Sequence, residues 1–96
     1  MSEMLDKAVA VLADKMSGED VGGSVKFDID GEGAIMMDDA GVRAEDGDAD
    51  VTLKADAETF EEILDGSLNP TAAFMGGRLT VDGDMGLAMK LASVLS

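Results

Sequence analysis

The fold of this chain is decided by residues 68–91, which read LNPTAAFMGGRLTVDGDMGLAMKL. Asn69 followed by Pro70 predicts the start of a short helix, because asparagine caps helices well and proline suits the first helical position. The glycines at 76–77 end that helix, and the alternation over residues 79–81 predicts a short strand. These signals place a helix, a strand and a further helix in quick succession.

The further helix is predicted over residues 85–95, after a cap at Asp84, and it is apolar on two faces. Lys90 is its only charged residue, whereas a helix that covers one side of a sheet normally has a single apolar stripe and a polar face. One stripe comprises Leu87, Leu91 and Leu95 with Val94 beside it, and the other comprises Met85, Met89 and Ala92. The first stripe predicts packing on a sheet. The second requires another apolar environment: more of the core, a bound lipid, a partner subunit or a membrane surface.

Upstream of this stretch the residues predict a helix, four strands and a second helix. Apolar residues at helical spacing predict the first helix over residues 3–16. A period of two then predicts strands that begin near residues 23, 34, 42 and 51. Asp56 caps the next helix and Gly66 ends it, and its apolar stripe comprises Phe60, Ile63 and Leu64.

The predicted strands have one apolar and one polar face. This pattern is typical of a mainly antiparallel sheet that helices cover on one side. The long connections before and around the last strand allow one parallel pair there. The sequence therefore predicts a single two-layer α+β domain over residues 1–96.

The composition excludes several function classes. The chain has no cysteine and no histidine, so it has neither thiolate nor imidazole zinc ligands, and no Cys-His or Ser-His-Asp catalytic group. With 21 acidic and 7 basic residues, its net charge of −14 argues against nucleic acid and against anionic membrane surfaces. No apolar run approaches the roughly 20 residues of a membrane span. We expect no catalytic residue, metal, cofactor, nucleic acid or stable membrane insertion.

The acidity has two interpretations. A coat of carboxylates suits a cytoplasm with high salt, where repulsion between them is screened, so a halophilic source is one interpretation. The other is an ordinary soluble protein with a pI of about 4.1. The absence of cysteine and of a signal-peptide pattern predicts a cytoplasmic location.

One acidic segment partly resembles a calcium-binding loop. Asp28, Asp30 and Glu32 alternate, and Asp39 stands at the twelfth position. Strand patterns flank the segment where a calcium loop requires helices. Charged hairpin turns are the simpler interpretation.

Residues 68–91 closely resemble the signature of the SCP-2 (sterol carrier protein 2) sterol-transfer family. The shared pattern is Asn-Pro, Ala-Phe-Met, a glycine, a basic residue, a strand, Gly-Asp-Met and an apolar helix. Residues 49–56 and the helix after them are also similar, and the resemblance extends over about residues 4–95. It implies a five-stranded sheet covered by helices, with an apolar tunnel between them. It also implies non-catalytic binding and carriage of lipids: fatty acids, fatty acyl-CoA, sterols or isoprenoids.

The resemblance and the periodicity together predict the lipid-binding residues. The resemblance implies a tunnel wall made from Phe74, Met75, Met85, Leu87, Met89 and Leu91. The periodicity adds Phe60, Ile63 and Leu64, and the sheet residues Phe27, Ile35 and Met37. The choice of Ile35 and Met37 over Ala34 and Met36 depends on the hairpin register. The alternative function is a protein-interaction or dimerisation module that uses the same helix, and we expect a monomer or a weak homodimer.

Overall fold

The computed structural model describes residues 3–16, 22–38 and 40–95. Nine elements follow one another along this part of the chain, and they agree in kind and order with the elements predicted from the sequence. They are α1 (Glu3–Lys15), β1 (Val25–Asp30), β2 (Gly33–Asp38), β3 (Gly41–Arg43), β4 (Val51–Asp56), α2 (Ala57–Asp65), α3 (Pro70–Met75), β5 (Thr80–Gly83) and α4 (Met85–Leu95).

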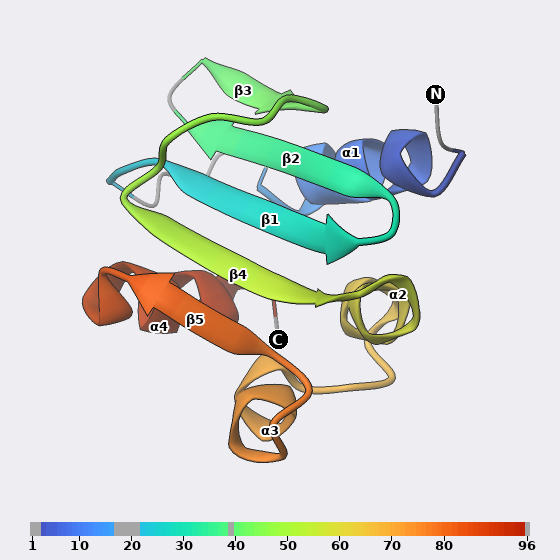
Figure 1. Ribbon diagram of the computed structural model, residues 1–96, viewed down its shortest axis with the longest axis vertical. Coiled ribbons are helices and arrows are strands. Elements are labelled where there is room, and N and C mark those ends of the chain that lie inside the picture. The colour runs from blue at the N-terminus through green and yellow to red at the C-terminus, as the bar shows by residue number, and fades with distance from the viewer. Residues whose placement is uncertain (1–2, 17–21, 39, 96) are drawn as a thin grey trace.

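The strands form one five-stranded sheet in the order β3-β2-β1-β4-β5 (Figure 1). The β1–β2, β2–β3 and β4–β5 pairs are antiparallel, and β1–β4 is parallel. The prediction of a mainly antiparallel sheet with one parallel pair is therefore confirmed. The expected position of the parallel pair was wrong, because the last strand, β5, is antiparallel to β4. The parallel pair lies at the centre of the sheet, and β2, β3 and the loop after them carry the chain from β1 to β4.

The strand register sets the face to which each side chain points. Phe27 lies opposite Ile35 on β2 and Leu53 on β4, and all three are buried on the helix side. Val25 lies opposite Met37 in the same way. The predicted choice of Ile35 and Met37 as the core-facing residues of β2 is confirmed.

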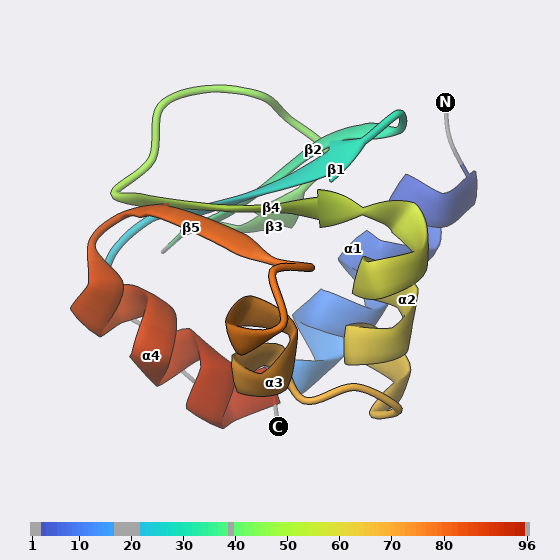
Figure 2. The same cartoon turned by 60° about the horizontal axis from the view of Figure 1, so that its bottom comes forward.

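Met36 is also buried, although it belongs to the opposite face of the sheet. It pairs with Lys26 and Arg43 and is 4% exposed. The loop between β3 and β4 passes over this face, as Figure 2 shows, and a Cβ atom built on Gly47 would lie 3.4 Å from the Met36 Cε atom. The outer face is therefore not uniformly polar, because this loop shields one methionine from water.

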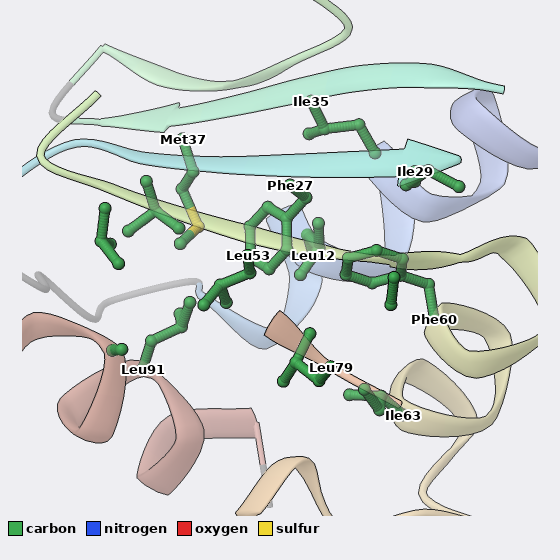
Figure 3. Close-up of a cluster of buried hydrophobic side chains, with 14 of the residues drawn as sticks. Leu12, Phe27, Ile29, Ile35, Met37, Leu53, Phe60, Ile63, Leu79 and Leu91 are labelled. Atoms are coloured by element: carbon green, nitrogen blue, oxygen red, sulfur yellow. The ribbon is translucent and has the colours of Figure 1, made fainter. Parts of the chain in front are cut away.

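The helices cover the other face of the sheet (Figure 2), and the hydrophobic core lies between the two layers. Side chains from the strands point toward α1, α2 and α4 (Figure 3). At the centre of the core, the Phe27 and Phe60 rings pack edge to face with centroids 5.8 Å apart. Leu12 of α1, Ile63 of α2 and Leu91 of α4 are each no more than 3% exposed. One core therefore joins the sheet to α1, α2 and α4, and Ala73 of α3 also belongs to it.

The helix ends follow the capping residues predicted from the sequence. The Asp56 carboxylate accepts a hydrogen bond from the Thr59 amide at 2.8 Å, and the bonds from Thr59 lower the pKa of that carboxyl. Gly66 ends α2 in the left-handed region at φ +87°. Among the described residues, no helix has the length and apolarity that crossing a bilayer would require.

Gly83, at the end of β5, occupies a position before α4 that has no room for a side chain. Its φ is +114°, and a Cβ atom added there would lie 2.4 Å from the Asp50 carbonyl oxygen. The next amide, of Asp84, donates to that same carbonyl at 3.0 Å. This close approach places the start of α4 directly beyond the end of the sheet.

Candidate functional site

An apolar groove with a volume of about 430 Å³ lies between α3, β5 and α4. Figure 2 shows the two helices side by side below β5. The residues that line the groove are Leu53, Asn69, Pro70, Thr71, Phe74, Met75, Leu79, Val81, Met85, Ala88, Met89, Ala92 and Ser93. Its volume falls within the range of about 300–1,000 Å³ that is typical of small-molecule sites.

The groove gathers large apolar side chains that face water. Within the described residues, the exposed large hydrophobic side chains are Phe74, Met75, Met85 and Met89, at 43, 80, 46 and 70% exposure. All of them line the groove. Large apolar side chains that share one exposed surface are typical of binding sites, because contact of these groups with water is unfavourable.

Helix α4 supplies one wall of the groove through the second of its two apolar stripes. Leu87 and Leu91 point into the core, where they are 8% and 0% exposed. Met85, Met89 and Ala92 line the groove. The second apolar environment that the sequence required is therefore this groove, and Leu87 and Leu91 anchor the helix that forms it.

Helix α3 supplies the opposite wall. The Asn69 side-chain oxygen caps it by accepting from the Thr71 amide at 2.8 Å and the Ala72 amide at 3.4 Å. Ala73 is 1% exposed, and its carbonyl accepts from the Arg78 and Leu79 amides at 2.9 and 3.1 Å. These contacts hold the short helix against the core and leave its other side to line the groove.

Replacing Asn69 with alanine (Asn69→Ala) is expected to lower the free energy of unfolding by about 1 kcal/mol, because it removes the cap. The matched control is Asn69→Asp, which keeps an acceptor and should retain nearly full stability. Urea denaturation of the three proteins measures the difference. Equal losses in both variants would show that the cap does not stabilise α3.

The groove carries no formal charge. Its polar members are Asn69, Thr71 and Ser93, and none of its lining residues is acidic or basic. Arg78, which precedes the lining residue Leu79, forms an ion pair with Glu62 of α2, and this hydrogen bond raises the pKa of the guanidinium. The site can hold an apolar molecule, but its lining offers no group for acid–base or nucleophilic chemistry.

The structure separates the twelve side chains that the sequence predicts as lipid-binding into three places. The groove contains Phe74, Met75, Met85 and Met89. The hydrophobic core contains Phe27, Ile35, Met37, Phe60, Ile63, Leu87 and Leu91. Leu64 lines a separate hollow of about 110 Å³ between α1 and α2. That any of them binds lipid stays a prediction.

Several lining residues were missing from the predicted set. Ala92 already belonged to the second stripe of the last helix, but Leu79 and Val81 were assigned only to a strand. Asn69 and Thr71 gave no signal beyond the start of a helix. Met75 and Met89 are the most exposed of the large side chains that line the groove. The groove is therefore open to solvent along these two residues.

The acidic segment around residues 28–32 forms part of a hairpin. The Glu32 amide donates to the Ile29 carbonyl at 2.9 Å and closes the β1–β2 turn. Across the described residues, no group of three or more acidic side chains is arranged to hold a metal ion.

Comparison with known proteins assigns the family. A family model described as the SCP-2 sterol transfer family matches residues 2–96. The chain belongs to the SCP-2 sterol transfer family. Solved structures of SCP-2 proteins share its fold. Sterol carrier protein 2 like 2 of Aedes aegypti superposes with a TM-score of 0.80 at 21% identity, over 95% of each chain.

Two similar structures hold a fatty acid. Sterol carrier protein 2 of Aedes aegypti in complex with palmitate has a TM-score of 0.80 at 23% identity, over 100% of this chain and 97% of that one. Palmitated SCP2L2 of the same organism has a TM-score of 0.74 at 27% identity, over 99% of this chain and 95% of that one.

The curated relatives are much longer proteins. Hydroxysteroid dehydrogenase-like protein 2 of Danio rerio is 37% identical over 105 residues, which cover 100% of this chain and 25% of that protein. The human protein of the same name is 33% identical over 87 residues, covering 91% of this chain and 20% of its own length. This SCP-2 domain therefore spans about a quarter or less of these relatives.

Proposed function

We propose that this SCP-2 domain binds a lipid in the groove between α3, β5 and α4 and carries it without catalysis. The observation that carries the proposal is that the exposed large hydrophobic side chains of the described residues line this one uncharged groove. Two proteins of the same fold hold palmitate, which supports a lipid as the occupant.

Burial of an alkyl chain would drive binding. Each methylene transferred from water contributes about 0.8 kcal/mol, so a twelve-carbon segment gains on the order of 10 kcal/mol before the costs of association. Met75, Met85 and Met89 suit this role, because methionine is flexible and polarizable and adapts to irregular partners. We expect modest selectivity for the length and shape of the apolar part among fatty acids, fatty acyl-CoA, sterols and isoprenoids. A cytoplasmic location stays a prediction.

A second candidate is an interaction or dimerisation module. Met75 and Met89 are 80% and 70% exposed, so a protein surface could cover them as well as a lipid could. In that case the groove would be filled by side chains of a partner or of a second copy. The mass of the native protein distinguishes the two functions.

Native mass spectrometry of the protein purified from a lipid-rich host tests the proposal. The sample is kept at high salt until exchange into a volatile buffer, because the net charge is −14. We expect a mass increment that matches a lipid and disappears after delipidation, and extraction then identifies the ligand. A bare monomer mass, with no uptake after incubation with fatty acids or isoprenoids, would contradict lipid binding. A dimer mass without lipid would favour the second candidate.

A further inference from the structure

We infer that the groove selects lipids whose polar end is uncharged, such as a long-chain alcohol, an ester or an isoprenoid alcohol, over fatty-acid anions and acyl-CoA. The inference rests on the proposed lipid-binding function and names the ligand class. Its basis is electrostatic. An anionic end drawn into the groove finds no cation among the described lining residues, and one that stays at the solvent-open side is still repelled by the net charge of −14.

The lining of the groove is the first argument. All thirteen lining residues are neutral, and most are aliphatic, aromatic or methionine side chains. An ionised carboxylate that enters such a site loses hydration and gains no opposite charge, which is unfavourable. A hydroxyl or ester loses far less hydration and needs only a neutral partner.

The charges around the groove are the second argument. Asp82 and Asp84 stand next in the chain to the lining residues Val81 and Met85. Lys54, Arg78 and Lys90 stand next to the lining residues Leu53, Leu79 and Met89, and Arg78 pairs with Glu62. These neighbouring charges are of both signs, so the net charge of the whole chain sets the sign of the field. The whole chain carries a net charge of −14, so its field repels an approaching anion.

Neutral hydrogen-bonding groups on the α3 wall of the groove are the third argument. The Asn69 side-chain oxygen accepts from the backbone amides of Thr71 and Ala72, which leaves its NH₂ group as a donor on this wall. The Thr71 hydroxyl can both donate and accept. Both residues line the groove and are exposed. This pair matches a hydroxyl or a carbonyl and offers no full positive charge to a carboxylate.

The test compares hexadecanol with palmitate, which has the same chain length and a charged end. Each displaces a pyrene-labelled long-chain alcohol from the delipidated protein, at about 0.01 M and about 1 M salt, where the Debye length is ~30 Å and ~3 Å. We expect hexadecanol to bind at least about tenfold more tightly at low salt, and the ratio of the two affinities to fall at least about threefold at high salt. The salt-dependent change in the ratio separates charge repulsion from the greater apolarity of the alcohol.

Two lysine variants test whether the weak binding of palmitate arises from the lining of the groove. Thr71→Lys places an ammonium group on the groove wall, and Ala13→Lys makes the same change of net charge on the exposed side of α1, away from the groove. We expect Thr71→Lys to tighten palmitate binding about tenfold and Ala13→Lys to change it less than about twofold, because a charge in contact outweighs a distant screened one. Neither should strengthen hexadecanol binding.

The outcomes separate this inference from the proposed function. Palmitate that binds wild type as tightly as hexadecanol at low salt, or equal effects of the two lysine variants, would overturn the inference and leave lipid binding intact. Failure of the probe to bind the delipidated protein, with no uptake of hexadecanol or palmitate either, would overturn both proposals together.

Discussion

Met89→Asp is expected to lower the affinity for a long-chain lipid by at least about tenfold and to leave the free energy of unfolding within about 0.5 kcal/mol of wild type. Met89 is 70% exposed and lines the groove, so aspartate remains hydrated when the groove is empty. In the complex, the same carboxylate would face the alkyl chain and lose its water. Displacement of the pyrene-labelled alcohol measures affinity, and urea denaturation measures stability.

Two matched variants test whether the loss of lipid affinity comes from the polar group in the groove, from the added negative charge or from the absence of methionine. Met89→Leu keeps an apolar side chain of similar size and should bind lipid nearly as well as wild type. Ala13→Asp adds the same negative charge on α1 and should leave affinity for the neutral alcohol unchanged, because Ala13 does not line the groove. A folded Met89→Asp protein with wild-type affinity would place the lipid outside the groove.

Phe27→Ala is expected to have the largest effect on stability, about 3–5 kcal/mol in the free energy of unfolding. Phe27 is 1% exposed, at the centre of β1, and its ring packs edge to face on Phe60 at 5.8 Å. Removal of the ring loses its buried area and leaves a cavity between the sheet and the helices. For a domain of this size, each kcal/mol lowers the Tm by roughly 4–8 °C, so calorimetry resolves the change easily.

The control is the same chemical change at an exposed site, Phe74→Ala. Phe74 is 43% exposed and lines the groove, so its removal should cost about 1 kcal/mol or less in stability and should weaken lipid binding. A loss of stability at Phe74 equal to that at Phe27 would mean that the groove residues belong to the folding core.

The division of α4 into two stripes was predictable from the sequence. Helical spacing places Leu87 and Leu91 on one side, and Met85, Met89 and Ala92 on the other. The structure places the first pair in the core and the other three residues on the groove. Local caps were equally predictable, because Asp56 and Asn69 act on amides two or three residues away.

Periodicity did not distinguish the residues of the core from those of the groove. Phe27, Phe60 and Ile63 were predicted to bind lipid because they are apolar and face the helices or the sheet. In the structure they belong to the same buried core cluster, and they are no more than 3% exposed. An apolar pattern reports that a side chain avoids water, but it does not report whether protein or ligand replaces that water.

The sequence by itself determined the order of the elements, their caps and the surplus of apolar surface on α4. These features depend on residues close together in the chain or on strict periods of 2 and 3.6. Only the tertiary structure decided that β1 and β4 pair in parallel and that α3 stands across from α4 to form the groove. Both results depend on contacts between distant segments, such as Phe27 with Leu53 across β1 and β4, and on the burial of Ala73 that seats α3. The neutral lining of the groove follows from that arrangement. The groove is lined by residues of α3, β5 and α4 and by Leu53 of β4, which only the tertiary structure brings together.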